Sequence, residues 1–235
     1  WLQGELDRSP PDRIAYKREL DRLWSEDSSD TRRRDALNRF QRREMLRIAG
    51  RDLLGKDTLR STTEQLSNLA DAMAHGALRV AMAELGAEDP LPGVFSIIGM
   101  GKLGGRELNY SSDIDLIYIY DPAEPDNGKS HERFQKLGRR LTALLGEHTA
   151  EGYLYRVDLR LRPMGQRGGL VYSLAQCAQY YESMGETFER FALIKARPVA
   201  GDAALGERFV EMVRPFVYRK YLDHAALEEL ARYKA

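Results

Sequence analysis

Two short apolar stretches joined by a glycine-rich loop constrain the fold of this chain more than any other feature. Residues 94–98 are β-branched or aromatic except for one serine and lead directly into glycines, which is typical of a buried strand. Residues 113–120 (DIDLIYIY) continue as an apolar stretch on both faces, which indicates a strand in the centre of a sheet. Residues 106–111, which separate the loop from this second strand, are too few to hold the full helix of a dinucleotide-binding fold.

Helical patterns lie on both sides of the first two strands. Residues 30–50 have apolar side chains at roughly helical intervals, and residues 30–51 contain eight arginines and three acids, a local net charge of +5. This basic face is either a solvated helix surface or a docking surface for an acidic partner. Residues 61–85 predict a longer amphipathic helix, which Ser61 and Glu64 would open as a capping box. A further amphipathic helix is predicted over residues 131–149.

The second half of the chain adds two predicted strands and then more helix. Residues 153–162 alternate strictly, which predicts a strand with Asp158 and the neighbouring arginines on its polar face. A short strand follows over residues 170–172, and the pattern from residue 173 onward is helical, with breaks near Gly185 and across residues 198–202. The order predicts a helical segment over 1–90, an α/β core over 91–172 and a helical segment over 173–235.

Composition excludes several classes of protein. Lys+Arg and Asp+Glu both number 36, so the formal net charge is zero, which argues against a nucleic-acid clamp or a basic membrane binder. No apolar stretch reaches the roughly 18 residues of a membrane span. The single cysteine, Cys177, is expected to be a core thiol, and its isolation favours a reducing cytoplasm over a disulfide framework. The chain starts with tryptophan and ends within a helical pattern, so we expect a piece of a longer protein.

The glycine loop matches familiar phosphate-binding and metal-binding motifs only in part. Gly99, Gly101 and Gly104 spell a dinucleotide fingerprint but lack the helix that this motif requires. Lys102 is followed by leucine, where a Walker A loop needs serine or threonine. A calcium loop is excluded because apolar residues occupy positions 114 and 116, which would have to be polar. The loop nevertheless offers backbone amides that can approach phosphate closely.

Paired aspartates carry the strongest chemical signal. Asp113 and Asp115 are two apart on a strand and therefore share a face, where two carboxylates are costly unless a positive group neutralises them. Asp158 on the later strand would complete a site for two Mg²⁺ or Mn²⁺ ions, with Arg160 and Arg162 beside it to hold phosphate oxygens. The alternatives are two solvated carboxylates at a strand start and an exposed strand whose polar face is salt-bridged. The arrangement favours metal-dependent phosphoryl-group chemistry.

Three blocks of sequence resemble the glutamine synthetase adenylyltransferase family. They are residues 99–116 (GMGKLGGRELNYSSDIDL), 156–163 (RVDLRLRP) and 187–202 (TFERFALIKARPVAGD), and residues 215–223 (PFVYRKYLD) add a fourth. The resemblance runs from about Arg43 to the end of the chain. It implies an α/β (α+β) fold with a nucleotidyltransferase sheet of the DNA polymerase β type, flanking helices and further helical segments at both ends.

The same resemblance implies a function and a set of site residues. The pair Glu189–Arg190, Lys195 and the PFVYRKYLD block are similar to the N-terminal, adenylyl-removing half of a bifunctional enzyme with two catalytic domains. That half removes AMP from a tyrosine of glutamine synthetase, with inorganic phosphate as acceptor and ADP as product. The family's metal ligands correspond to Asp113, Asp115 and Asp158. Its phosphate-binding and nucleotide-binding positions correspond to Gly101, Lys102, Gly104, Gly105, Ser112, Arg160, Arg162, Lys195 and Arg197.

Two other functions compete with adenylyl removal. Forward adenylylation from ATP would use the same carboxylates, because phosphoryl transfer depends on positioning and charge neutralisation in either direction. A non-catalytic module that senses a nucleotide is the third hypothesis, and the intact set of three aspartates speaks against it. Any of the assigned cations could instead pair with a nearby acid such as Glu107 or Glu189. The family also implies regulation by a PII-type signalling protein, and we expect no nucleic acid or membrane as partner.

Overall fold

A computed structural model describes residues 2–25, 30–86, 91–124 and 128–218 of the chain. Within these ranges the helices are α1 (Leu2–Asp7), α2 (Arg13–Ser25), α3 (Asp30–Leu53), α4 (Leu59–Gly86), α5 (Gly101–Gly104), α6 (Lys129–Gly146), α7 (Leu174–Ser183), α8 (Thr187–Leu193) and α9 (Ala203–Val217), with the short 3₁₀ turn η1 (Gly165–Arg167). The strands are β1 (Gly93–Gly99), β2 (Ile114–Pro122), β3 (Val157–Asp158), β4 (Val171–Ser173) and β5 (Arg197–Gly201). The predicted α/β fold class is confirmed, and the mixed sheet is consistent with a nucleotidyltransferase-like fold.

The sheet is built around β2. Its strand order is β3-β2-β1-β5, and β4 also pairs with β2. The β1–β2 and β1–β5 pairs are antiparallel, whereas β3 and β4 both run parallel to β2. Residues 116–120 of β2 are all buried, because helices cover both faces of the sheet. The prediction of a central strand at this position is confirmed.

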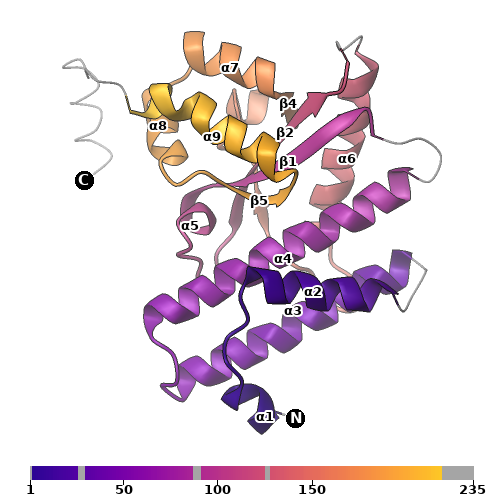
Figure 1. Ribbon diagram of the computed structural model, residues 1–235, viewed down its shortest axis with the longest axis vertical. Helices are drawn as coiled ribbons and strands as arrows, with labels where there is room; N and C mark the ends of the chain where they lie inside the picture. The colour runs from indigo at the N-terminus through magenta and orange to yellow at the C-terminus, as the bar shows by residue number, and fades with distance from the viewer. Residues whose placement is uncertain (1, 26–29, 87–90, 125–127, 219–235) are drawn as a thin grey trace.

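Helices cover the two faces of the sheet with two separate hydrophobic cores. Leu116, Tyr118 and Tyr120 of β2 belong to the first core, which they share with α2, α3, α4 and α6. The alternate residues Ile117 and Ile119 belong to the second core, which they share with α7, α8 and α9. Figure 1 shows this layering, with α7 and α9 on one side of the sheet and the long helices α3 and α4 on the other. Because the first core joins helices and sheet, residues of the predicted segments 1–90 and 91–172 pack as one unit.

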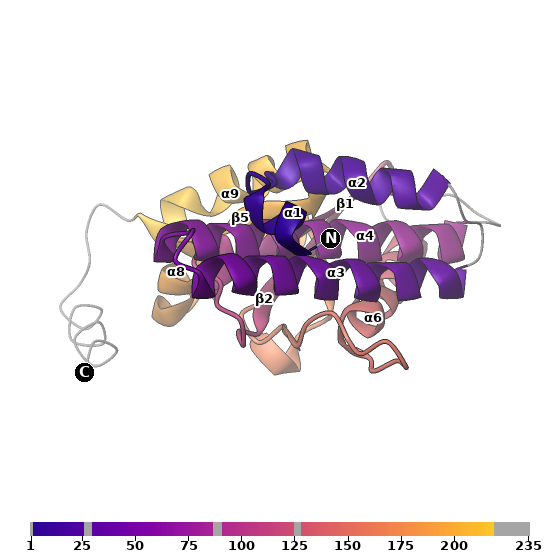
Figure 2. The same cartoon turned by 90° about the horizontal axis from the view of Figure 1, so that it is seen from below.

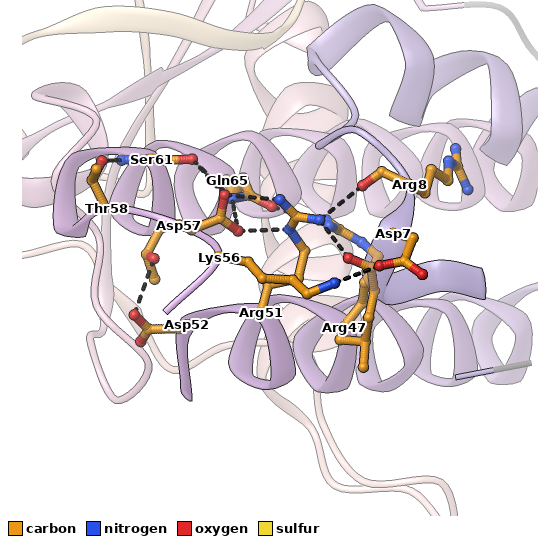
Figure 3. A network of polar contacts seen from close by, with 12 residues as sticks. Asp7, Arg8, Arg47, Arg51, Asp52, Lys56, Asp57, Thr58, Ser61 and Gln65 are labelled. Carbon is orange, nitrogen blue, oxygen red and sulfur yellow. Dashed lines mark hydrogen bonds and ion pairs between the residues drawn. The ribbon is translucent and has the colours of Figure 1, made fainter. Parts of the chain in front are cut away.

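The long helices α3 and α4 lie alongside each other and are joined at their turn by a polar network (Figure 2, Figure 3). Arg51 donates to both carboxylate oxygens of Asp57, at 2.7 and 3.1 Å, and to the backbone oxygens of Leu6 and Arg8. The backbone amide of Ser61 donates to the Thr58 hydroxyl at 3.2 Å, so Thr58 caps α4. The predicted capping box at Ser61 and Glu64 is therefore wrong, because the helix already begins at Leu59.

The structure corrects two further predictions about strands. Of residues 153–162, only Val157–Asp158 pair as a strand, because the chain turns directly afterwards at residues 160–161. Residues 197–201 form β5 rather than a break between helices, and they pair with β1. Part of the block at 215–223 lies outside the described residues, as does 219–235 of the predicted last segment. Among the described helices, each is too short or too polar to cross a bilayer.

Candidate active site

The register of β2 and β3 brings two of the three predicted aspartates side by side. In this parallel pair Ile114 lies opposite Val157, and Asp115 lies opposite Asp158. Asp113 comes directly before β2 and two residues before Asp115. Asp115 shares the face of β2 that carries Ile117 and Ile119, which pack in the second core. The carboxylates therefore belong to the end of the sheet face that α7, α8 and α9 cover further along.

Two of these carboxylates are paired with arginines. Arg156 binds Asp113, with Nε 2.5 Å from Oδ1, and also donates to the backbone oxygen of Ser111 at 2.8 Å. Arg160 donates from Nε to both carboxylate oxygens of Asp158, at 3.0 and 2.8 Å, and from its backbone amide to Oδ1. With the side chains so placed, no group of three or more His, Cys, Asp or Glu residues in the described ranges is arranged to hold a metal ion.

The carboxylates of Asp158 and Asp113 lie close enough to Asp115 to affect its ionisation. Burial raises the pKa of Asp115, and the carboxylates of Asp158 and Asp113 raise it further, while Arg160 and Lys102 act in the opposite direction. The pKa of Asp158 is lowered, chiefly by the hydrogen bond from Arg160. Three neighbouring carboxylates supply the oxygen ligands that Mg²⁺ and Mn²⁺ prefer. The type of donor therefore suits a hard divalent cation, but in this structure Arg156 and Arg160 occupy the carboxylates of Asp113 and Asp158.

The glycine loop packs directly against Asp115. Met100 donates its backbone amide to the backbone oxygen of Asp115 at 2.9 Å. Gly101 has a φ of +52°, and a Cβ at this position would lie 2.5 Å from Asp115 Oδ2. At Gly104 a Cβ would lie 2.1 Å from the backbone oxygen of Lys195. Glycine is therefore needed at both positions, where it lets the loop approach the carboxylate on one side and residues 195–197 on the other.

Some of the cations assigned from the sequence act on the aspartates, and others bind partners outside the site. Lys102 and Arg160 act electrostatically on the aspartates, as described above. Lys195 instead forms an ion pair with Glu107 at 2.6 Å, one of the alternatives left open by the sequence. Arg162 donates to the backbone oxygens of Leu159 and Gly169 and so holds the turn after β3. Ser112 donates its hydroxyl to Asn109 Oδ1 at 2.6 Å.

Arg197 connects the glycine loop to the helical layer. Its guanidinium donates to both carboxylate oxygens of Asp71, at 2.6 and 2.9 Å, and to the backbone oxygens of Leu103 and Gly104. Asp71 lies on α4 and is fully buried, with Arg13 of α2 3.6 Å away. Burial raises the pKa of Asp71, and the Arg197 hydrogen bond opposes that shift. Sequence reasoning missed Asp71, because it follows Ala70 directly and so lies outside the apolar stripe of the helix, with no local signal of its burial.

The structure also corrects the predicted surroundings of Lys195 and Arg197. The spacing of Phe188 and Phe191 on α8 is typical of a buried stripe, but both side chains are 36% exposed. Leu193 of this helix is buried in the second core, and Ala192 packs against that core. Arg197 lies at the start of β5 rather than at a helix end. Cys177 is buried in the second core as expected, and burial raises the pKa of its thiol to about 12.

Comparisons with known proteins agree on one family. The family model described as glutamate-ammonia ligase adenylyltransferase matches residues 1–212. A relative from Nitrosococcus oceani is 42% identical over 233 residues, and one from Thioalkalivibrio sulfidiphilus is 45% identical over 210 residues. A third, from Pseudomonas aeruginosa, is 44% identical over 211 residues. All three bear the name bifunctional glutamine synthetase adenylyltransferase/adenylyl-removing enzyme.

The matches cover most of this chain but only a small part of each relative. They span 94%, 85% and 84% of this chain, and 24%, 22% and 22% of the respective relatives. The chain therefore spans about a quarter of the length of the curated relatives that it matches. The two activities in the relatives' name belong to those longer proteins.

Proposed function

This chain belongs to the glutamate-ammonia ligase adenylyltransferase family, and on that premise we propose that it removes the adenylyl group from glutamine synthetase by phosphorolysis. An oxygen of inorganic phosphate forms a bond to the adenylyl phosphorus, and the bond from that phosphorus to the tyrosine oxygen breaks. The products are ADP and a tyrosine whose oxygen takes up a proton. The direction of transfer follows from the resemblance of the blocks around Glu189–Arg190 and Lys195 to the adenylyl-removing half.

The observation that carries this proposal is the juxtaposition of acidic residues from two strands. Asp115 lies opposite Asp158 in the β2–β3 register, and Asp113 adds a third carboxylate whose charge is felt at Asp115. These three side chains would hold Mg²⁺ or Mn²⁺. The bound cations would neutralise charge on the transferring phosphoryl group and orient it.

Arginines at the site have a second role in this proposal. Arg156 and Arg160 now neutralise Asp113 and Asp158, and both guanidinium groups are largely exposed to solvent. The Arg156–Asp113 pair is exposed on both sides and holds its partners weakly. Asp158 is only 14% exposed, and there a cation would have to replace Arg160 at a mostly covered carboxylate. The released Arg160, together with Lys102, would then contact phosphate oxygens, for which a guanidinium fork is well shaped. Arg162, Lys195 and Arg197 would support the site through their protein partners.

Forward adenylylation from ATP is the second candidate, because the relatives' name contains both activities. The same carboxylates serve either direction, since the transition state is stabilised in the same way. The direction depends on whether the pocket accepts a free phosphate or a nucleoside triphosphate. The cytoplasmic location and a PII-type regulator remain predictions from the sequence.

The direct test is ADP release from adenylylated glutamine synthetase in the presence of phosphate and Mg²⁺. We expect turnover by the unmodified chain and its loss, by at least about a thousandfold, in Asp113→Asn and Asp158→Asn, as is usual when a metal-dependent centre loses a ligand. Asp121→Asn is the matched control, because Asp121 lies at the other end of β2 and pairs with Arg208 at 2.7 Å. Retained turnover in both site variants would refute the proposal. Labelled AMP appearing on unmodified glutamine synthetase would instead establish the forward reaction.

A further inference from the structure

A pocket of about 530 Å³ lies between η1, α7 and α8. Its volume is within the range of small-molecule binding sites. The lining residues come from the turn after β3 (Met164–Arg167), from α7 and its end (Tyr180, Met184), and from the start of α8 (Glu186, Phe188, Glu189). None of these residues has a role in the site described above. The question is therefore which chemical group the pocket accepts.

The pocket is directly connected to the turn that carries Arg160. Gly165 donates its backbone amide to the backbone oxygen of Arg162 at 2.8 Å, and a Cβ at Gly165 would lie 3.4 Å from the backbone oxygen of Arg160. Leu161 in the same turn packs against the second core, together with Tyr180 of α7. Asp115 shares the sheet face of this core. The pocket therefore lies on the same side of the sheet as the carboxylates, and its lining begins six residues after Asp158 in the chain.

Exposed apolar side chains line the pocket. Met164 is 48% exposed, Met184 55% and Phe188 36%, although residues of these types are usually covered in a folded protein. Phe188 presents an aromatic ring and the methionines present polarisable thioethers, which pack favourably against a flat ring. Gln166 adds an amide, which can both donate and accept a hydrogen bond. This combination suits a planar heterocycle with polar edges.

A hydrogen-bonded frame holds the wall of the pocket. The Tyr180 hydroxyl lies 3.1 and 3.0 Å from the two carboxylate oxygens of Glu189, which is only 3% exposed. The backbone amide of Glu186 donates to the same carboxylate at 2.8 Å. With two glutamates and one arginine, Arg167, the ionisable side chains of the lining carry a net negative charge. A phosphate group is therefore disfavoured here, and a neutral base is not.

We propose that this pocket binds the adenine ring of the adenylyl group, with Phe188 as its stacking partner. The proposal rests on the proposed function, which puts the phosphate of that group at the three aspartates. A rival pocket of about 310 Å³, lined by Tyr110, Tyr153 and Arg156, also adjoins Asp113. It also includes Ser112, directly before Asp113, and Gln41 and Met45 of α3, so it reaches from the site toward the first core. The base would enter the larger pocket.

Two aromatic residues on α8 provide a matched pair of variants. Phe188 lines the pocket, whereas Phe191 does not, and the two side chains are equally exposed. The experiment measures equilibrium binding of ADP and of pyrophosphate to the chain in the presence of Mg²⁺. The variants are Phe188→Ala, Phe188→Trp, Phe191→Ala and, for the rival pocket, Tyr153→Ala.

We expect Phe188→Ala to weaken ADP binding by about tenfold or more, the loss typical of removing one aromatic partner from a stacked base. Pyrophosphate binding should stay unchanged in this variant, because pyrophosphate has no base. Phe188→Trp should restore ADP binding, and Phe191→Ala and Tyr153→Ala should bind both ligands as the unmodified chain does.

Equal ADP affinity in Phe188→Ala and the unmodified chain would overturn the assignment of the base, and so would a loss confined to Tyr153→Ala. Such a result leaves the proposed function standing if ADP release from adenylylated glutamine synthetase still depends on Asp113 and Asp158. Absence of ADP binding to the unmodified chain would overturn the pocket assignment as well. The ADP-release assay alone decides the proposed function.

Discussion

Arginine–carboxylate pairs occur in two regions of this molecule under opposite conditions. In the helical layer, the side chains of Arg51 and Asp57 are 10% and 6% exposed, and their pair is surrounded by further hydrogen bonds (Figure 3). At the end of β2, the side chains of Arg156 and Asp113 are 63% and 46% exposed. The same chemical pair is therefore enclosed in one place and open to solvent in the other.

This difference in exposure indicates that the buried pair stabilises the fold, whereas the exposed carboxylate can bind another partner. A buried pair must stay together, because either partner alone would be an uncompensated charge in a medium of low polarity. An exposed pair contributes little to stability, and water or another ion can replace either partner. We infer that the helical layer and Asp71 fix the position of the glycine loop, while Asp113, at the start of β2, remains free to exchange partners.

The largest loss of stability is expected from replacing Asp71, the buried acid that binds Arg197. Asp71→Ala leaves Arg197 and Arg13 without their carboxylate and should lower the free energy of unfolding by about 3–5 kcal/mol. Urea denaturation followed by circular dichroism measures this loss. Asp113→Ala is the comparison variant, and we expect its urea midpoint to match that of the unmodified chain. Equal midpoints for Asp71→Ala and the unmodified chain would remove the distinction between the two regions.

A pH-dependent effect is expected from Asp57. The hydrogen bond from Arg51, with further help from Gln65 and Ser61, lowers the pKa of Asp57 to about 2 against the effect of burial. Because the folded pKa is below the unfolded value, this stabilisation is complete above about pH 4 and is lost as the pH falls toward 2.

Between pH 4 and pH 2, the free energy of unfolding of the unmodified chain should therefore fall by about 1–2 kcal/mol through Asp57. The Asp57→Asn variant should lack this part of the fall. Urea midpoints of both proteins at several pH values in this window measure the effect. If the two proteins lose stability in parallel over the window, Asp57 is not the group responsible.

A smaller loss of stability with a clear loss of activity is expected at Gly101. The substitution Gly101→Ala forces a Cβ into the left-handed region and against Asp115, at a cost of about 1–2 kcal/mol. ADP release should fall at least about tenfold, because the carboxylate must move from its position. Urea denaturation and the release assay on the same preparation compare the two effects. Unchanged activity would show that the contact of the loop with Asp115 has no role in the reaction.

The smallest effect is expected for the exposed arginine pair. Arg156→Gln removes the partner of Asp113, and no measurable change in the urea midpoint should follow, because both side chains are open to water. Arg47→Gln is the matched contrast, since Arg47 and its partner Glu44 are fully buried on α3. A lower midpoint for Arg156→Gln than for Arg47→Gln would reverse the comparison.

Sequence patterns predicted those elements whose structure is decided locally. The strands at 94–98 and 113–120 and the helices around 30–50, 61–85 and 131–149 were recovered with small errors at their ends. β5 was missed because residues 197–201 are short and contain a proline, and only pairing with β1, about 100 residues away, makes them a strand. Alternation over 153–162 overestimated β3, since pairing with β2 extends over two residues only.

In the candidate site, too, local patterns could be predicted and long-range contacts could not. Asp113 and Asp115 could be singled out because acids at the end of an apolar strand are unusual, whichever partners they meet. Asp158 could be singled out as the acid on the polar face of an alternating segment. The tertiary partners of the cations could not be found in this way. Arg197 was expected to contact nucleotide, but the fold places it against Asp71, 126 positions earlier in the chain. Similarly, the spacing of Phe188 and Phe191 indicated a buried face, whereas Leu193 makes the contact with the core.

The central claim is that Asp113, Asp115 and Asp158 form one cation-binding centre. Titration of the chain with Mn²⁺, with free ion measured by electron paramagnetic resonance, tests it most directly. We predict saturable binding that weakens at least about tenfold in Asp115→Asn, because one carboxylate ligand of a hard cation is lost, and that is unchanged in Asp121→Asn. Equal Mn²⁺ binding by the unmodified chain and Asp115→Asn would contradict the claim.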